Sequence, residues 1–195
     1  MRRHVLVAIR LALVTVVSLG FAYPLVITGL AQIIFPRQAN GSLVTVGSQV
    51  IGSALIGQPF TRPEYFHPRP SAAGGGYDAA ASGGSNLGPT SQKLARRVAG
   101  SAARLVKENP GLRARKIPAD MVTASASGLD PDISPANAYA QAARVANARH
   151  MSEDRVRRLV EANVTGRQFG LLGEPRVNVL WLNLALDAAQ RTNSK

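Results

Sequence analysis

The side chains that most often perform catalysis or bind metals are sparse in this 195-residue sequence. There is no cysteine, which excludes a disulfide framework, a thiolate zinc site and a cysteine nucleophile. His4, His67 and His150 share no metal-ligand spacing, and the eleven acidic residues are scattered along the chain. We therefore expect no metal site, no intrinsic cofactor and no catalytic residue of the chain's own.

Two short motifs approach known chemistry without completing it. Residues 83–90 (GGSNLGPT) have the glycine spacing and threonine of a phosphate-binding loop, but Pro89 stands where a lysine would reach the phosphates. A hydrolase that used Ser127 or His67 would need a base and an orienting carboxylate, and the sequence offers no convincing set. Neither motif predicts an enzyme.

Asp130 and Asp132 lie two positions apart in the segment GLDPDIS, residues 128–134. Because Asp-Pro favours turns, this spacing is more typical of turn chemistry than of paired acid–base catalysis.

The net charge of +12 first suggests nucleic acid. However, the basic residues are spaced along predicted helices, and aromatic residues for stacking on bases make up only 5% of the chain. We expect no nucleic-acid partner; contact with anionic lipid head groups, or a generally Arg-rich composition, accounts for the charge.

Residues 11–35 contain no charged side chain and exceed the about 20 apolar residues that span a bilayer as a helix. A cleaved signal peptide is the alternative, but its apolar region covers only about 7–15 residues. We therefore predict an uncleaved transmembrane helix over residues 11–36. Arg2 and Arg3 precede it, so the positive-inside rule places residues 1–10 in the cytoplasm and residues 37–195 outside.

The remaining residues predict one small extracytoplasmic α/β domain with about three helices and a small sheet. Propensity and helix-capping signals indicate these elements: a strand over 43–56 with a bend near Gly52, a helix over 92–108, a short strand over 118–124, a helix that begins at Ser134-Pro135, a helix from Ser152 to Gly166, and a buried strand over 176–186. A helix that begins after Pro175 is the alternative for the last segment.

Residues 65–91 form a long run rich in Gly, Ala, Ser and Pro between two aromatic clusters. A loop of this length inside a compact domain is usually functional or disordered. We predict an ordered contact surface that packs on the domain or on a partner, and an entropic spacer is the alternative.

Several motifs in order resemble one family, the C subunit of the bacterial Kdp potassium-transporting ATPase (KdpC). They cover nearly the whole chain after the membrane helix: GSALIGQPF (52–60), YFHPRPSA (65–72), GGSNLGPT (83–90), GLDPDISP (128–135) and LGEPRVNVL (172–180). The chain departs from the family pattern at Ala126, where a glycine is usual, and at the extra glycines of residues 74–76.

The resemblance implies a non-catalytic accessory subunit of a high-affinity potassium uptake complex in the inner membrane. Its partners would be a potassium-channel-like subunit, a P-type ATPase subunit and a small single-helix subunit, besides membrane lipids. The family is described as a catalytic chaperone that raises the affinity of the ATPase subunit for ATP. On that view Gln168, with Arg167 in VTGRQ, would contact ATP bound jointly with the pump subunit.

The topology argument favours a different role, because a domain outside the membrane cannot meet cytoplasmic ATP. Such a domain would act at the potassium entrance of the channel-like subunit, with neutral or acidic residues turned toward the pore. The candidate partner contacts are His67, Arg69, Ser71, Tyr77, Asp78, Asn86, Asp130 and Asp132. A membrane-anchored binding module unrelated to transport is the alternative function.

Overall fold

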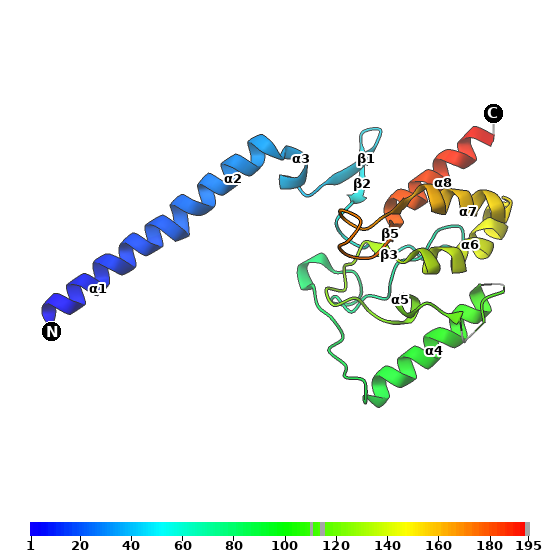
Figure 1. The fold of residues 1–195 in the computed structure, drawn as a ribbon, viewed down its shortest axis with the longest axis horizontal. Helices are drawn as coiled ribbons and strands as arrows, with labels where there is room; N and C mark the ends of the chain where they lie inside the picture. Colours follow the sequence, from blue (N-terminus) through cyan, green and yellow to red (C-terminus); the bar gives the residue numbers. More distant parts are fainter. Residues whose placement is uncertain (110, 114–115, 194–195) are drawn as a thin grey trace. The chain divides into compact units, whose positions relative to one another are not determined.

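The structure is a computed structural model that describes residues 1–109, 111–113 and 116–193, and the chain forms two compact units (Figure 1). The first unit spans Met1–Ser53 and the second spans Ala54–Lys195. The predicted class is confirmed, since one apolar N-terminal helix precedes an α/β arrangement of helices and two small antiparallel sheets.

One helix of 33 residues, from Arg2 to Ile34, dominates the first unit (Figure 1). The predicted apolar helix is therefore present, and it begins at Arg2 rather than at Leu11. It consists of three consecutive segments, α1 (Arg2–Thr15), the π-helical η1 (Val16–Ala22) and α2 (Tyr23–Ile34).

The widened turn of η1 directly precedes a proline. The Tyr23 amide donates to the carbonyl of Ser18, five positions back instead of four. Pro24 has no amide hydrogen and its ring crowds the carbonyl of Gly20, so a local π turn relieves the clash. The helix therefore continues past Pro24.

The first unit ends in a short helix, α3 (Pro36–Ala39), and a β-hairpin. The prediction of a single strand over 43–56 is wrong, because β1 (Leu43–Val46) and β2 (Gln49–Ser53) pair as antiparallel strands. Gly47 is the first of the two connecting residues and has φ +62°, a conformation that glycine adopts freely and a two-residue hairpin turn requires.

The second unit contains the small sheet that the sequence predicts. Its three strands are antiparallel in the order β3-β5-β4: β3 (Asp132–Ile133), β5 (Arg176–Asn178) and β4 (Val164–Thr165). Val177 of the central strand pairs with Ile133 on one side and Val164 on the other, and it is fully buried.

Two predicted helices form where capping signals place them. The helix α4 (Gln92–Glu108) begins after Ser91, whose Oγ accepts a hydrogen bond from the Leu94 amide. The helix α6 (Pro135–Arg149) begins after Ser134, whose Oγ accepts from the Asn137 amide at 3.1 Å. Pro110, part of the predicted stop signal after α4, lies outside the described residues.

Two other predictions need correction. Residues 118–124 are not a strand; they hold one helical turn, α5 (Ala119–Val122), where Asp120 accepts hydrogen bonds from Ser134 and Asn137 at the start of α6. The helix α7 (Glu153–Ala162) ends before Gly166 because the next residues pair with β5 as strand β4.

The prediction of a buried strand over 176–186 is wrong beyond Asn178. The alternative helix is present as α8 (Val179–Asn193), and it begins at Val179 rather than directly after Pro175. The side chain of Asn178 accepts a hydrogen bond from the Trp181 amide at 3.2 Å, so the last residue of β5 also satisfies the first turn of α8.

The main core lies where α6, α7 and α8 meet the small sheet, on the side of the C-terminus in Figure 1. Phe66, from the long loop, is the largest fully buried side chain in it. The other buried members are Ile133, Ala138, Ala142, Val145, Ala146, Val156, Val160, Val177, Val179, Leu182 and Leu186. The loop is therefore part of the core, through Phe66.

Candidate functional site

The long loop crosses the second unit with its backbone fixed by two buried side-chain amides. Asn183 of α8 accepts from the Phe66 amide at 2.8 Å and donates to the Phe66 carbonyl at 3.0 Å. Gln141 of α6 does the same for His67, at 2.8 and 3.0 Å. These two amides stand in for a neighbouring β-strand, because they satisfy both backbone groups of consecutive residues that would otherwise be buried unpaired.

Two buried arginines continue this pattern upstream of Phe66. Arg144 donates to the Tyr65 carbonyl at 3.0 Å and to Asn109 Oδ1 at 3.1 Å, and burial lowers its pKa to about 10, so it stays protonated at neutral pH. Arg149 donates to the Glu64 carbonyl at 2.6 Å and lies 4.9 Å from the centre of the Tyr65 ring. Arg144 and Arg149 of α6 therefore stabilise the fold.

Arg149 also has a carboxylate partner. Its guanidinium lies 2.7 Å from Asp187 Oδ1, and only 3% of the Arg149 side chain is exposed. A buried charge of this kind is tolerated only when it is paired and hydrogen-bonded. The contact ties the C-terminal end of α6 to α8.

The rest of the loop packs against residues 125–132. Gly83 donates its amide to the Ser127 carbonyl at 2.8 Å, and Gly57 donates to the Leu129 carbonyl at 2.8 Å. Gly128 has φ +70°, and a Cβ there would lie 2.6 Å from the Ala73 nitrogen. The loop is therefore an ordered surface packed on the domain, as one of the two predicted possibilities required.

Ala126 causes no strain in this arrangement. Its φ is not in the left-handed region, so alanine fits where the family pattern usually has glycine. The glycine that this contact requires is Gly84, where the two chain segments lie so close that a Cβ would be 2.7 Å from the Ala126 carbonyl oxygen.

Three predicted contact residues meet in one hollow of about 280 Å³, which we call the Asp130 pocket. Arg69 Nη1 lies 2.7 Å from Asp130 Oδ2, and Arg176 Nε lies 3.0 Å from Asp132 Oδ2. Burial, followed by the charge of Asp130, raises the pKa of Asp132. Asp120 and Glu174 also line the hollow.

Each carboxylate of the Asp130 pocket already has a partner. Asp120 accepts from the start of α6, and Glu174 is paired with Arg167. Among residues 1–109, 111–113 and 116–193, no three His, Asp or Glu side chains are placed to hold a metal ion. In this pocket Arg69 and Arg176 pair with Asp130 and Asp132, whereas Asp120 is held by hydrogen bonds from uncharged donors.

Two further candidates line a second hollow of about 290 Å³, the His67 pocket, together with Phe60, Pro68 and Pro70. The Tyr77 hydroxyl donates to the Arg69 carbonyl at 2.6 Å, and burial raises the pKa of Tyr77 to about 12. The His67 Nε2 lies 3.1 Å from the Arg62 carbonyl oxygen. Burial, and secondarily the charge of Arg144, lowers the pKa of His67.

The remaining candidates are not gathered into one site. Ser71 lies beneath Tyr77 and accepts its backbone amide at 2.8 Å, which shapes the loop. Asp78 and Asn86 are exposed, and Asp78 accepts from the Ala80 amide at the start of a short 3₁₀ turn. Asn86 has φ +49°.

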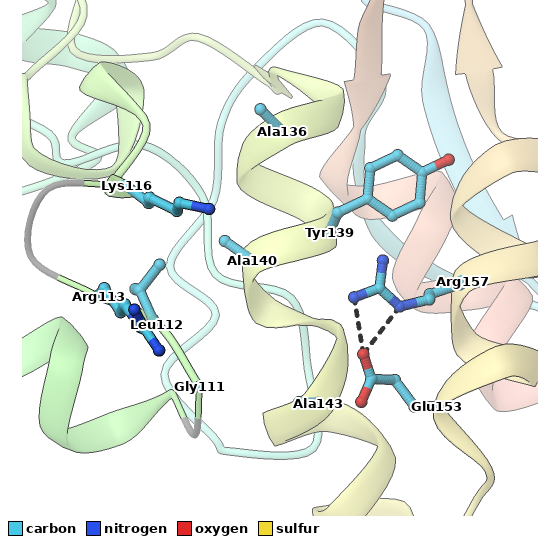
Figure 2. A pocket seen from close by; sticks show the side chains of 10 residues that line it. All are labelled: Gly111, Leu112, Arg113, Lys116, Ala136, Tyr139, Ala140, Ala143, Glu153 and Arg157. Atoms are coloured by element: carbon cyan, nitrogen blue, oxygen red, sulfur yellow. Dashed lines mark hydrogen bonds and ion pairs between the residues drawn. The ribbon is translucent and has the colours of Figure 1, made fainter.

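A third hollow, of about 390 Å³, lies among α6, α7 and the chain that follows α4, and none of the predicted site residues lines it. Figure 2 shows Lys116 and Arg113 on one side, with Tyr139, Arg157 and Glu153 on the other. Arg157 pairs with Glu153 at 2.7 Å and lies 5.6 Å from the centre of the Tyr139 ring. Its lining is basic, which suits an anionic group.

The predicted nucleotide residues lie in the connection between β4 and β5. Gln168 exchanges two backbone hydrogen bonds with Leu172, each 2.9 Å, and Arg167 pairs with Glu174 at 2.7 Å. Neither Gln168 nor Arg167 lines any of the hollows described above. Their contact with ATP stays a prediction.

The same connection carries residues that are not among the predicted contacts. Phe169, Leu171 and Leu172 are 93%, 80% and 60% exposed. Apolar residues among glycines have neither helical nor strand periodicity, so only their density in GRQFGLLG could have drawn attention to them.

Comparison with known proteins gives a consistent match. A family model described as "K+-transporting ATPase, c chain" (KdpC) matches residues 5–188. A potassium-transporting ATPase KdpC subunit from Myxococcus xanthus is 62% identical over 183 residues, covering 93% of this chain and 86% of the relative. A KdpC subunit from Koribacter versatilis is 55% identical over 190 residues, covering 97% of each chain. One from Acidobacterium capsulatum is 59% identical over 184 residues, covering 94% of this chain and 97% of the relative.

We predict that Gly128→Ala destabilises the second unit by about 2–4 kcal/mol, because the new Cβ would occupy backbone space at a left-handed φ. Urea unfolding of the full chain in detergent, followed by the fluorescence of the single tryptophan Trp181, measures the change. Gly75→Ala is the matched control, since nothing lies within 4 Å of a Cβ at that position. Equal stability of the two variants would contradict the packing described here.

His67 predicts a loss of stability in acid. Its folded pKa is lowered, so its stabilising contribution is complete above the unfolded pKa of about 6.5 and is lost as pH falls through the lower folded value. We expect the urea midpoint to fall less steeply from pH 7 to 5 in His67→Gln than in the original chain. Gly75→Ala, which removes no titratable group and whose Cβ meets nothing within 4 Å, is the control and should keep the original slope. Identical slopes for all three proteins would refute the assignment.

Proposed function

Because the chain belongs to the KdpC family of K⁺-transporting ATPase subunits, we propose that it is a non-catalytic accessory subunit that stabilises an ATP-driven potassium uptake complex. One observation carries the proposal beyond the family name. Buried side chains of α6 and α8 hold the backbone of residues 64–67, and the rest of the loop packs against residues 125–132, which makes it a preformed contact surface.

The polar groups of this surface support a structural role in the complex. Arg69, Asp130 and Asp132 are committed to ion pairs, and the Tyr77 hydroxyl donates to a backbone carbonyl. Because these side chains are already hydrogen-bonded or ion-paired, they are not available as catalytic groups. They instead give the surface a fixed shape and fixed hydrogen-bonding groups for contact with another protein. We propose that the channel-like subunit of the complex is the surface on which they rest.

We further propose that the chain is a single-pass protein of the inner membrane with its second unit on the extracytoplasmic side. The Arg2–Ile34 helix is long and apolar enough to cross a bilayer, and with family membership it indicates a membrane location. Arg2, Arg3 and Arg10 lie at its N-terminal end, which favours a cytoplasmic N-terminus.

At the potassium entrance the second unit would act by position rather than by coordination of the ion. All 11 acidic residues and 19 of the 23 basic residues lie in residues 54–195, a net charge of +8. A basic body repels potassium at close range, and Asp130 and Asp132 of the Asp130 pocket are each paired with an arginine. The proposed role is therefore to hold the channel-like subunit in its working conformation.

The chaperone role, in which Gln168 and Arg167 contact ATP together with the pump subunit, is the competing mechanism. It requires the second unit to lie in the cytoplasm. It also requires Arg167 to leave Glu174, since the two side chains form a doubly hydrogen-bonded pair.

Topology separates the two mechanisms. We expect reporter enzymes fused after Asn40 and at Lys195 to be active only outside the membrane, while the tagged chain co-purifies with the channel-like and ATPase subunits. Cytoplasmic activity of both reporters would overturn the entrance role. A chain that is located outside but never co-purifies would instead indicate an anchored binding module unrelated to transport.

We predict that Gln168→Ala in the assembled pump leaves the ATP concentration for half-maximal activity unchanged within about twofold, because Gln168 would lie across the membrane from ATP. ATPase activity titrated against ATP measures it, with Gln92→Ala, an exposed glutamine on α4, as the matched control. A rise of about tenfold confined to Gln168→Ala would favour the chaperone mechanism.

A further inference from the structure

The connection between β4 and β5, residues 167–174, is named the tip loop here. Phe169, Leu171 and Leu172 of this loop are 93%, 80% and 60% exposed. No other large apolar side chain in the described part of residues 54–195 is as exposed, and the next is Leu55 at 58%. Single apolar residues scattered over a protein surface are ordinary. Three exposed apolar residues within four consecutive positions form a patch, which is typical of a binding surface.

The tip loop holds this patch in one shape. Gln168 and Leu172 exchange hydrogen bonds between their backbones, and the amides of Gly170 and Leu171 donate to the Arg167 and Gln168 carbonyls at 3.2 and 3.1 Å. Phe169 has φ +53°, a conformation that an L-residue other than asparagine or aspartate rarely adopts. The backbone thus turns to direct apolar side chains outward, where they have no internal packing role.

An ion pair closes the base of the tip loop and cancels its charge. Both terminal oxygens of Glu174 accept from Arg167 Nη2, at 2.8 and 2.7 Å. Loops that dip into an anionic bilayer usually carry unpaired basic residues beside their apolar side chains. Here the only basic residue is neutralised, and 79% of the Glu174 side chain is exposed. The charge pattern therefore favours an apolar protein surface over a lipid surface.

From these observations we infer that the tip loop docks into an apolar socket on the channel-like subunit of the potassium pump, with Phe169 as the anchor and Leu171 beside it. This inference rests on the proposed function, since it needs a complex in which the second unit meets another protein. Rigid aromatic residues that enter a pocket commonly dominate the affinity of an interface. A loop already held in its bound shape also loses little conformational freedom on docking.

The affinity of the full chain for the rest of the pump tests this socket. The pump without this subunit is purified in detergent and titrated with the labelled full-length chain. Phe169→Ala combined with Leu171→Ala should raise Kd at least about tenfold. Because both side chains are exposed, the urea midpoint of the double variant should stay unchanged, which separates lost docking from lost folding.

Two controls sharpen the titration. Val106→Ala removes an exposed apolar side chain from α4 and should change Kd by less than about twofold. Exchanging the charges of the pair, Arg167→Glu with Glu174→Arg, keeps the base of the tip loop closed and should also leave Kd within about twofold. If the Phe169→Ala and Leu171→Ala double variant binds as tightly as Val106→Ala, the socket is overturned.

A photoreactive benzoylphenylalanine in place of Phe169 identifies what the tip loop meets in the intact membrane. An adduct between this chain and the channel-like subunit is the expected result. A lipid adduct, an adduct with another polypeptide, or no adduct overturns the socket while leaving the accessory role intact. If the unmodified chain itself fails to bind the rest of the pump, the proposed function fails together with the socket.

Discussion

The structure of the second unit depends on a single requirement, that buried backbone groups of an irregular loop find hydrogen-bond partners. Residues 57–91 cross the domain without belonging to a sheet, yet Phe66 is fully buried. An unpaired buried amide or carbonyl costs about 1–3 kcal/mol, so such a path is stable only where side chains replace a neighbouring strand. Gln141 and Asn183 each do this with both the oxygen and the nitrogen of the side-chain amide. Arg144 and Arg149 donate to the carbonyls of the two preceding residues, Tyr65 and Glu64. The shape of the exposed surface follows from these interior contacts.

This requirement also explains part of the charge of the chain. Arginine is suited to bind several carbonyls at once because its donors point in fixed directions and it stays protonated even when burial lowers its pKa, as at Arg144. Arg69 and Arg176 likewise lie against carboxylates in the Asp130 pocket. Part of the positive charge that suggests a nucleic-acid or lipid surface therefore belongs to arginines that make contacts within the domain.

Local signals located some elements and could not locate others. Ser134 followed by Pro135 marked the start of α6, because a cap and its proline act within one turn. The start of α8 could not be located from the sequence, because the alternating apolar pattern after Pro175 also fits a strand. Only two contacts in the structure favour a helix: the cap at Asn178 and the contact of Asn183 with Phe66, 117 positions away. For the same reason the sequence does not reveal that Gln141 and Arg149 are buried. The loop was anticipated as an ordered surface, whereas the exposed Phe169 had no periodicity to reveal it.

The way in which the chain enters the second unit has a mechanical consequence. Immediately after Ser53, the carbonyl of Ala54 accepts a hydrogen bond from Asn178 at 3.0 Å, and the amide of Gly57 donates to Leu129. Asn178 is the last residue of the central strand, β5, so tension in the tether reaches the sheet before it reaches any loop. A pull on Ala54 is therefore resisted first by these two hydrogen bonds. The attachment point of the second unit is thus linked directly to its central strand, so force applied there would be passed to the sheet.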